Sequence, residues 1–176
     1  MRLLVLGGAG YIGSVVAAEL VAAGHSVTVG DDGSRGHARV AGAEHVEVDL
    51  ADRRGLDALL SRGFDAVLHF AALSIVPESV ADPERYFRAN VVGTLNLLEA
   101  MTAHGTARIV FSSTAAVYGE PDSVPIDEDA PTRPTSPYGA SKLAVDHLLT
   151  GWATARSGGA VSLRYFNVAG AAHGLG

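Results

Sequence analysis

Short runs of apolar and β-branched residues alternate along this chain with longer segments in which apolar residues recur every three or four positions. The short runs are typical of strands buried on both faces, and the longer spacing predicts amphipathic helices. Six strands are predicted, over Arg2–Leu6, Ser26–Val29, His45–Val48, Ala66–Phe70, Arg108–Ser112 and Ala160–Arg164. Four helices are predicted between them, over Tyr11–Ala23, Arg53–Ser61, Pro83–Ala103 and Pro137–Arg156. This alternation predicts an α/β fold in which helices cover both faces of a parallel sheet.

The segment between the fifth strand and the last predicted helix has a different composition. Residues 118–137 carry five prolines, at positions 121, 125, 131, 134 and 137, together with several acidic residues. Such a segment predicts an irregular, exposed loop. The length of 176 residues favours one domain, and no repeat or linker divides it. Because the chain stops shortly after the sixth strand, we expect it to be part of a larger fold.

A glycine-rich turn follows the first strand and leads into the first predicted helix. Gly7, Gly10 and Gly13 fit the pattern G-x-x-G-x-x-G, and Gly8 also satisfies G-x-G-x-x-G. Glycines in this position permit a tight turn and let the backbone approach a pyrophosphate, while the helix N-terminus favours the anion. The alternative is a glycine turn needed only for packing. The strand–turn–helix context favours a dinucleotide site, which would also involve Tyr11 and Ile12 at the start of the helix.

An acidic residue stands at the end of the second strand, where dinucleotide-binding folds bind the adenosine ribose. Asp31 lies 31 − 13 = 18 residues beyond the last glycine. Its carboxylate would accept hydrogen bonds from the ribose hydroxyls and repel a 2′-phosphate, so NAD is predicted in preference to NADP. Asp32 is either a second ribose contact or a solvated turn residue.

Tyr138 and Lys142 lie four residues apart at the predicted start of the last helix. Ser136 is a good N-cap and Pro137 suits the first helical position, so both side chains should lie on one helix face. A cation beside a phenol favours the phenolate, which would make Tyr138 a general base near neutral pH. The alternative is an ordinary amphipathic helix whose tyrosine and lysine meet no substrate.

Hydroxyl side chains end the fifth strand, at the edge where open α/β sheets bind ligands. Ser113 or Thr114 is expected to hydrogen-bond a substrate oxygen beside Tyr138. Alternatively, these hydroxyls only terminate the strand.

Composition narrows the classes of function. The formal net charge of −6 gives no electrostatic reason to expect nucleic acid or an anionic membrane surface as a partner. The chain has no cysteine, and its seven histidines lack the spacing of ligands, so no metal site is predicted. The apolar start is too short for a signal sequence and no stretch has transmembrane length, so the sequence predicts a cytoplasmic protein.

Taken together, these motifs resemble the extended short-chain dehydrogenase/reductase family, and most closely its UDP-glucose 4-epimerases. The resemblance runs through nearly the whole chain. It rests on seven segments: Gly7–Gly13, His69–Ala72, Pro77–Val80, Asn90–Thr94, Ser112–Gly119, Pro137–Lys142 and Leu163–Asn167. The resemblance implies a doubly wound, Rossmann-type sheet and a tightly held NAD. That NAD would take a hydride from C4 of a nucleotide sugar and return it to the opposite face of a rotated 4-keto intermediate.

Roles for individual residues follow from the resemblance by position. Tyr138 would be the base for the sugar 4-hydroxyl, Lys142 would lower its pKa and hold the nicotinamide ribose, and Thr114 would hydrogen-bond the sugar. Asn167 would be a further substrate contact. The implied cofactor contacts are Gly7, Gly10, Tyr11, Ile12, Gly13, Asp31, Asp32, Asp49, Leu50, Phe70, Ala71, Ala72, Asn90, Ser112, Tyr138, Lys142 and Phe166. For Phe70 and Phe166 a place in the core is an alternative, as is a helix-surface position for Asn90.

The resemblance also implies a part of the family's fold that lies outside these 176 residues. In the family a smaller C-terminal domain binds the UDP moiety, and its arginines would lie beyond Gly176. We therefore expect residues 1–176 to form the NAD-binding domain of an enzyme acting on a UDP-sugar. The alternative is a catalytically silent NAD-binding module that acts through binding or self-association. The family commonly forms homodimers through the two long helices, here Pro83–Ala103 and Pro137–Arg156.

Overall fold

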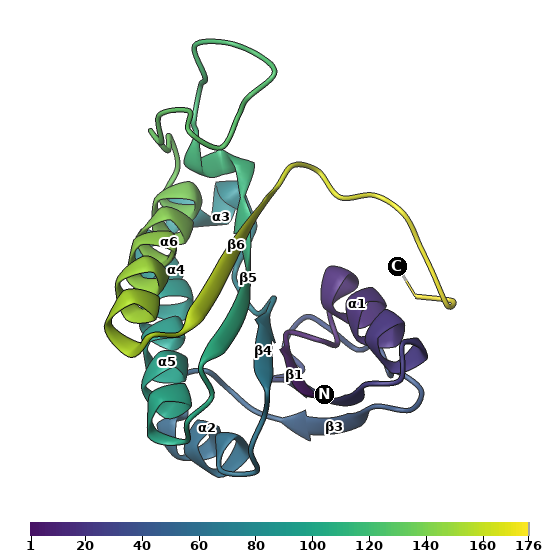
Figure 1. Ribbon diagram of the computed structural model, residues 1–176. Coiled ribbons are helices and arrows are strands. Elements are labelled where there is room, and N and C mark those ends of the chain that lie inside the picture. Colours follow the sequence, from purple (N-terminus) through teal and green to yellow (C-terminus); the bar gives the residue numbers. More distant parts are fainter. Residues whose placement is uncertain (176) are drawn as a thin grey trace.

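The computed structural model describes residues 1–175, and its centre is a six-stranded parallel sheet with the order β3-β2-β1-β4-β5-β6. The chain starts in the middle of the sheet, builds one half outward to β3, and then returns to build the other half (Figure 1). This is the strand order of a doubly wound Rossmann-type sheet, as predicted. The strands are β1 (Arg2–Leu6), β2 (Ser26–Asp31), β3 (Glu44–Glu47), β4 (Ala66–His69), β5 (Arg108–Thr114) and β6 (Gly159–Tyr165).

Helices cover both faces of the sheet, and alternate strand residues contact the two layers. Val5 of β1 packs with residues of α1 on one face, whereas Leu4 and Leu6 pack beneath α2, α5 and α6 on the other (Figure 1). The α-helices are α1 (Tyr11–Ala22), α2 (Arg53–Leu60), α3 (Val76–Ala81), α4 (Pro83–Phe87), α5 (Gly93–Ala103) and α6 (Pro137–Arg156). Two short helical segments complete the described structure, a π-helical one at Arg88–Val92 and a 3₁₀ one at Ala115–Val117.

The prediction of six strands in a parallel sheet is confirmed, with strand ends displaced by one or two residues. The predicted single helix over Pro83–Ala103 is wrong in its middle, because the π-helical segment separates α4 from α5. Helix α3 was not predicted: its six residues are too few to show a helical period, and it directly precedes α4.

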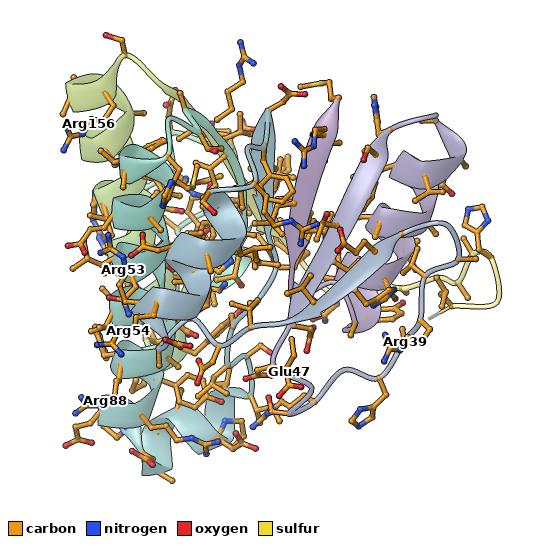
Figure 2. The ribbon with its side chains drawn as sticks, turned by 90° about the horizontal axis from the view of Figure 1, so that it is seen from below. Arg39, Glu47, Arg53, Arg54, Arg88 and Arg156 are labelled. Atoms are coloured by element: carbon orange, nitrogen blue, oxygen red, sulfur yellow. The ribbon has the colours of Figure 1, made fainter. Side chains whose placement is uncertain are left out.

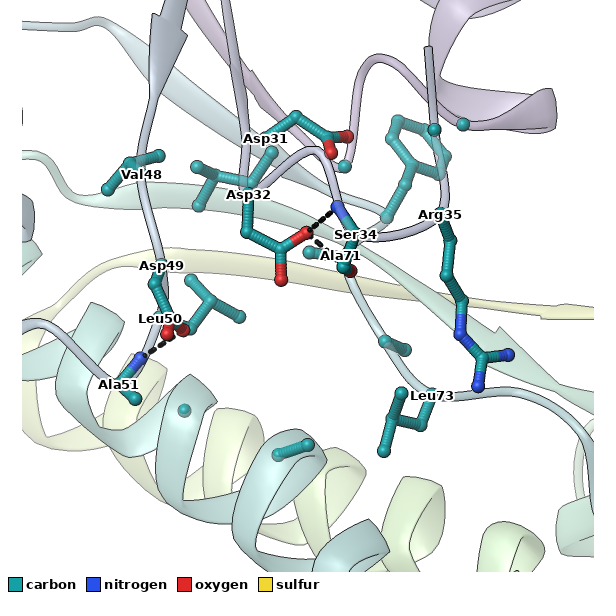
Figure 3. A pocket seen from close by; sticks show the side chains of 18 of the residues that line it. Asp31, Asp32, Ser34, Arg35, Val48, Asp49, Leu50, Ala51, Ala71 and Leu73 are labelled. Atoms are coloured by element: carbon teal, nitrogen blue, oxygen red, sulfur yellow. Dashed lines mark hydrogen bonds between the residues drawn. The ribbon is translucent and has the colours of Figure 1, made fainter. Parts of the chain in front are cut away.

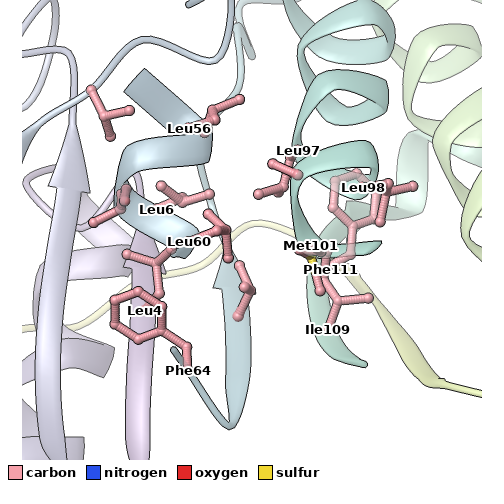
Figure 4. Packing of buried hydrophobic residues seen from close by; sticks show 14 of the residues in the cluster. Leu4, Leu6, Leu56, Leu60, Phe64, Leu97, Leu98, Met101, Ile109 and Phe111 are labelled. Atoms are coloured by element: carbon pink, nitrogen blue, oxygen red, sulfur yellow. The ribbon is translucent and has the colours of Figure 1, made fainter. Parts of the chain in front are cut away.

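The larger core cluster fills the space between the sheet and the α2, α5 and α6 layer. Leu4 and Leu6 of β1 contribute to it with Ile109 and Phe111 of β5 (Figure 4). Leucines and a methionine from the helices close the cluster: Leu56, Leu59, Leu60, Leu97, Leu98, Met101 and Leu149. These side chains are almost fully buried, so the core fixes β1, β4 and β5 relative to α2, α5 and α6.

Charged side chains lie around the outside of the molecule, with Arg53, Arg54, Arg88 and Arg156 along the helical layer (Figure 2). The segment after β6 crosses to the other face, where the Tyr11 hydroxyl donates a 2.7 Å hydrogen bond to the Gly170 carbonyl. In residues 1–175, no helix is both long and apolar enough to cross a membrane.

Candidate cofactor and catalytic site

The glycine turn between β1 and α1 is closely packed at two of its glycines. Gly7 has a φ of +74°, and a Cβ there would lie 2.4 Å from the backbone nitrogen of Ala71. A Cβ on Gly13 would lie 2.3 Å from the Gly7 carbonyl oxygen. Gly10 is the N-cap of α1 and has no side chain to occupy the N–H groups of the first turn. The turn therefore presents backbone N–H groups of a helix N-terminus without a covering side chain.

Asp31, at the end of β2, holds this turn and the following loop in place. Its Oδ2 accepts a 3.0 Å hydrogen bond from the Ala9 backbone N–H, and its Oδ1 accepts one of 2.9 Å from Gly33. Asp32 instead accepts from the backbone N–H and the hydroxyl of Ser34, through Oδ1 (Figure 3). Asp32 thus stabilises the turn after β2, which is one of the two roles that the sequence left open for it, and it also lines the cleft described next.

A cleft of about 440 Å³ opens beside this turn, between the carboxyl ends of β1, β2 and β4. Asp31, Asp49 and Leu50 line this cleft (Figure 3). The predicted cofactor residues that line it are Gly7, Gly10, Asp31, Asp32, Asp49, Leu50, Phe70, Ala71 and Ala72. Residues from four separate segments therefore meet at the edge where doubly wound sheets bind nucleotides.

The cleft also contains residues that sequence reasoning did not single out. Arg35, Arg85 and Arg88 bring positive charge to it, and Arg35 pairs with Glu78 of α3 at 2.7 Å. This ion pair is partly exposed and lowers the pKa of Glu78, chiefly through the hydrogen bond from Arg35. The cleft thus combines the glycine turn, the Asp31 carboxylate at the position where such folds bind the adenosine ribose, and an apolar wall of Leu50, Phe70 and neighbouring alanines. This combination fits a dinucleotide.

Lys142 occupies a buried position in the first turns of α6. The helix begins as predicted, with Pro137 at its first position and the Ser136 Oγ accepting from the Gly139 N–H at 3.1 Å. Lys142 is only 2% exposed; its Nζ donates a 2.8 Å hydrogen bond to the Ser112 carbonyl and lies 4.5 Å from the centre of the Phe111 ring. Burial lowers the pKa of Lys142 to about 7, and the charge of Asp146 acts in the opposite direction.

Tyr138 lies on the same helix, but its predicted pKa direction is wrong in this structure. Burial raises the pKa of Tyr138 above its ordinary value, and the hydrogen bond with Thr114 lowers it by less. The prediction assumed that the Lys142 ammonium faces the phenol. Instead that ammonium is held by the Ser112 carbonyl, so it does not offset the cost of burying a phenolate.

Ser113 and Thr114, the two hydroxyl residues that the sequence left as alternative partners of Tyr138, have different surroundings at the end of β5. Ser113 is buried and its hydroxyl donates to Asp146 Oδ2 at 3.1 Å, pointing away from Tyr138. Thr114 lies beside Tyr138 and also accepts from the Ala116 N–H at 3.1 Å. The geometry thus selects Thr114 as the partner of Tyr138. Ser112 contributes its carbonyl, not its hydroxyl, by accepting from Lys142.

Asn90 connects the segment after β4 to α6. It is buried within the π-helical segment, where its Oδ1 accepts from the Leu73 N–H at 2.9 Å. Its Nδ2 donates to the Leu73 carbonyl and to Ser141 Oγ, both at 3.0 Å. These bonds use both N–H donors of the amide, and Asn90 is only 3% exposed, so it is neither a lining residue of the cleft nor a helix-surface amide. A π-bulge at such a junction is typical of functional regions.

The remaining predicted residues lie outside the cleft lining. Gly13 is buried against the glycine turn, Ile12 is half-buried and Tyr11 is exposed. Phe166 and Asn167 follow β6 and are both exposed, which excludes a core position for Phe166.

His69 is buried in the core at the end of β4. Its Nε2 donates to Thr94 Oγ1 at 3.0 Å, because that hydroxyl itself donates to the Asn90 carbonyl. Burial lowers the pKa of His69 to about 3, which keeps the ring neutral. In the described part of the chain, no group of three or more acidic or histidine side chains is arranged to hold a metal ion.

The strand order, the glycine turn and the acid at the end of β2 define a Rossmann-type nucleotide-binding fold with the tyrosine–lysine pair of a dehydrogenase or epimerase. Residues 3–175 match the NAD dependent epimerase/dehydratase family. The chain belongs to that family.

Individual relatives agree with this assignment. The chain is 58% identical to a UDP-glucose 4-epimerase of Streptomyces lividans, over 99% of this chain and 54% of that protein. It is 54% identical to one from Corynebacterium glutamicum, over 100% of this chain and 54% of that protein. The crystal structure of the Brucella ovis UDP-glucose 4-epimerase in complex with NAD superposes with a TM-score of 0.92 at 42% identity, covering 94% of this chain and 52% of that one. This chain thus spans about half the length of the curated relatives it matches.

Proposed function

We propose that this chain is the NAD-binding domain, residues 1–176, of an NAD-dependent UDP-hexose 4-epimerase. The observation that carries the proposal is the meeting of the glycine turn, Asp31 and the apolar wall in one cleft at the carboxyl edge of the sheet. The Gly10 end of α1 would hold the pyrophosphate and Asp31 the adenosine ribose. The Asp31 carboxylate would repel a 2′-phosphate, so NAD should bind in preference to NADP.

Three residues at the ends of β5 and α6 would handle the proton of the sugar 4-hydroxyl. Bound NAD would supply the acceptor, and then the donor, of the C4 hydride. Tyr138 would accept the proton and later return it, with the Thr114 hydroxyl stabilising its phenolate. Lys142, fixed on the Ser112 carbonyl, would hold the nicotinamide ribose through its ammonium. Return of the hydride to the opposite face of C4, with return of the proton from Tyr138 to the C4 oxygen, would convert UDP-galactose to UDP-glucose.

A second candidate function is a catalytically silent NAD-binding module that acts by binding or self-association. The observation that favours it is the separation of the two groups of residues. Tyr138, Lys142 and Thr114 lie outside the lining of the cleft, whose walls come from the glycine turn, β2–β4 and the helices that follow. The adenosine and pyrophosphate part of NAD would therefore be bound by residues other than Thr114, Tyr138 and Lys142.

One experiment separates the two functions. The purified chain is incubated with UDP-galactose, UDP-glucose formation is followed, and retained NAD is measured after desalting. The Tyr138→Phe variant serves as the matched control, because it removes only the phenolic oxygen. Turnover that falls at least about 10²-fold in this variant, with NAD retained, supports the epimerase. NAD retention without turnover in the unaltered chain supports the silent module, and turnover of the variant within about tenfold of the unaltered chain removes Tyr138 as the base.

We also propose that the protein is a homodimer formed through the helical layer. Two apolar side chains on its outer surface support this, Val92 and Leu95, which are 47% and 41% exposed at the junction of the π-helical segment with α5. Leu98 and Leu149, by contrast, belong to the core and are unavailable for an interface.

A further inference from the structure

A buried carboxylate on α6 lies one turn beyond Lys142. This residue is Asp146, and its side chain is only 7% exposed. Its Oδ2 accepts hydrogen bonds from Ser113 Oγ at 3.1 Å and from Arg164 Nε at 3.3 Å. Its Oδ1 has no hydrogen-bond partner among residues 1–175. Because an unpaired buried carboxylate oxygen is costly, the position calls for a reason beyond packing.

Lys142 and Asp146 bind consecutive residues at the end of β5. Lys142 Nζ donates to the carbonyl of Ser112, and Asp146 accepts from the hydroxyl of Ser113. Thr114, which lies beside Tyr138, comes next in the strand. Two successive turns of α6 thus fix the segment that carries Thr114, and they place an anion on the same helix face as the only lysine of the sequence.

Arg164 extends these contacts to the proline-rich loop. Besides its contact with Asp146, its Nη1 donates to the Tyr118 hydroxyl at 2.8 Å and to the Glu128 carbonyl at 3.1 Å. The guanidinium also lies 5.1 Å from the centre of the Tyr118 ring. Asp146 therefore links α6 to β5 and β6, and through Arg164 it is connected to the loop after β5.

We propose that Asp146 is a positioning residue for the Tyr138–Lys142 pair: it fixes the end of β5 through Ser113, and its charge stabilises the buried Lys142 ammonium. The role of Asp146 in proton handling rests on the proposed epimerase function. Its effect on the charge of Lys142 does not, because that effect concerns the protonation of Lys142 in the chain without cofactor or substrate.

The other titratable groups around the pair do not replace this anion. His69 of β4 faces Lys142 but is neutral above a pKa of about 3. Tyr138 on α6 and Tyr86 on α4 both have a pKa raised above the ordinary value by burial, so they carry no charge near neutral pH. Arg164 of β6 is a cation, as is Lys142 itself. Asp146 is the anion whose charge raises the pKa of Lys142 against the effect of burial.

The single lysine makes the test direct. Lysine labelled with ¹³C and ¹⁵N gives one side-chain signal set, and its titration reports the protonation of Lys142 without cofactor or substrate. In Asp146→Asn the midpoint should fall by about one pH unit, the usual size of the effect of one nearby opposite charge. The matched control is Ser113→Ala, which removes a hydrogen bond to the same carboxylate but keeps the charge, and which should leave the midpoint unchanged.

The double variant Asp146→Asn/Arg164→Gln covers a failure of the single variant to fold, because it removes Arg164 together with the carboxylate that pairs with it. Its midpoint should fall as well, because the Asp146 charge that raises the pKa of Lys142 is absent. An unchanged midpoint in Asp146→Asn, or an equal fall in Ser113→Ala, would overturn the proposal. Failure of both Asp146 variants to fold would also overturn it, in favour of a purely structural role. NAD retention by the unaltered chain, measured in parallel, tests the proposed function separately.

Discussion

At the scale of single residues, the least expected feature is a lysine buried in the first turns of α6. An ammonium at 2% exposure loses most of its hydration, and here it regains one carbonyl contact, one aromatic face and the charge of Asp146. These contacts leave the pKa at about 7, well below the ordinary value of 10.5. Lys142 therefore reduces stability, and the cost is understandable only if its charge serves the site.

Replacing this lysine should consequently stabilise the chain. Between about pH 7 and 10.5 the unfolded chain binds more protons at this position than the folded chain. The penalty is thus fully present below pH 7 and disappears as the pH rises toward 10.5. Lys142→Met, of similar volume, should raise the free energy of unfolding by roughly 1–4 kcal/mol at pH 7, with a difference that shrinks at higher pH. Urea unfolding of both proteins from pH 6 to 10 measures this, and a difference independent of pH would refute it.

The Tyr138–Lys142 spacing shows what a sequence can predict at this scale. Helical geometry placed both residues on one helix, and the cap at Ser136 was correctly foreseen. The direction of the Tyr138 pKa was not, because burial and the competing carbonyl of Ser112 depend on tertiary packing.

At the scale of elements, α6 is a helix under two different constraints. Its first turns pack against the 3₁₀ segment after β5, so a Cβ on Gly139 would lie 2.6 Å from the Ala116 carbonyl oxygen. Near its other end Gly151 is exposed, and a Cβ there would meet nothing within 4 Å. The same residue type is therefore required at one end of the helix and costs stability at the other.

Alanine substitution should separate these two positions. Gly151→Ala should raise the free energy of unfolding by about 0.5–1 kcal/mol, because it reduces the entropy of the unfolded chain and adds no clash. Gly139→Ala should lower it by roughly 1–3 kcal/mol through overpacking. Each variant is the control for the other in denaturant titrations. Equal effects of the same sign would contradict the packing of α6 described here.

The π-helical segment Arg88–Val92 is an element that the sequence pattern did not predict. Apolar residues continue from α4 to α5 with a helix-like spacing, so one helix was predicted over Pro83–Ala103. The extra residue in the turn lets the Asn90 amide reach both Leu73 and Ser141. A period of apolar positions cannot reveal that bulge, since its cause is a hydrogen-bonded partner far away in the chain.

At the scale of the whole molecule, the site results from the strand order. Because β1 lies between β2 and β4, the glycine turn, Asp31 and the Phe70–Ala72 segment reach one edge of the sheet. The alternation of strands and helices predicted this topology, and so it predicted much of the cleft. The arginines at positions 35, 85 and 88 could not be predicted in the same way, because their place at the cleft depends on how the loop after β2, α4 and the π-helical segment pack against the sheet edge.

The helical layer supplies the last prediction, which concerns assembly. Leu95 is an exposed leucine on α5, and at a dimer interface the burial of such a side chain contributes about 1.5–3 kcal/mol. Leu95→Glu should therefore shift a dimer toward monomer in sedimentation and light-scattering measurements, while leaving the fold intact by circular dichroism. The matched control is Val124→Glu, because Val124 is 79% exposed on the proline-rich loop away from the helical layer. A monomeric unaltered chain, or a dimer that tolerates Leu95→Glu as well as Val124→Glu, would exclude assembly through α5.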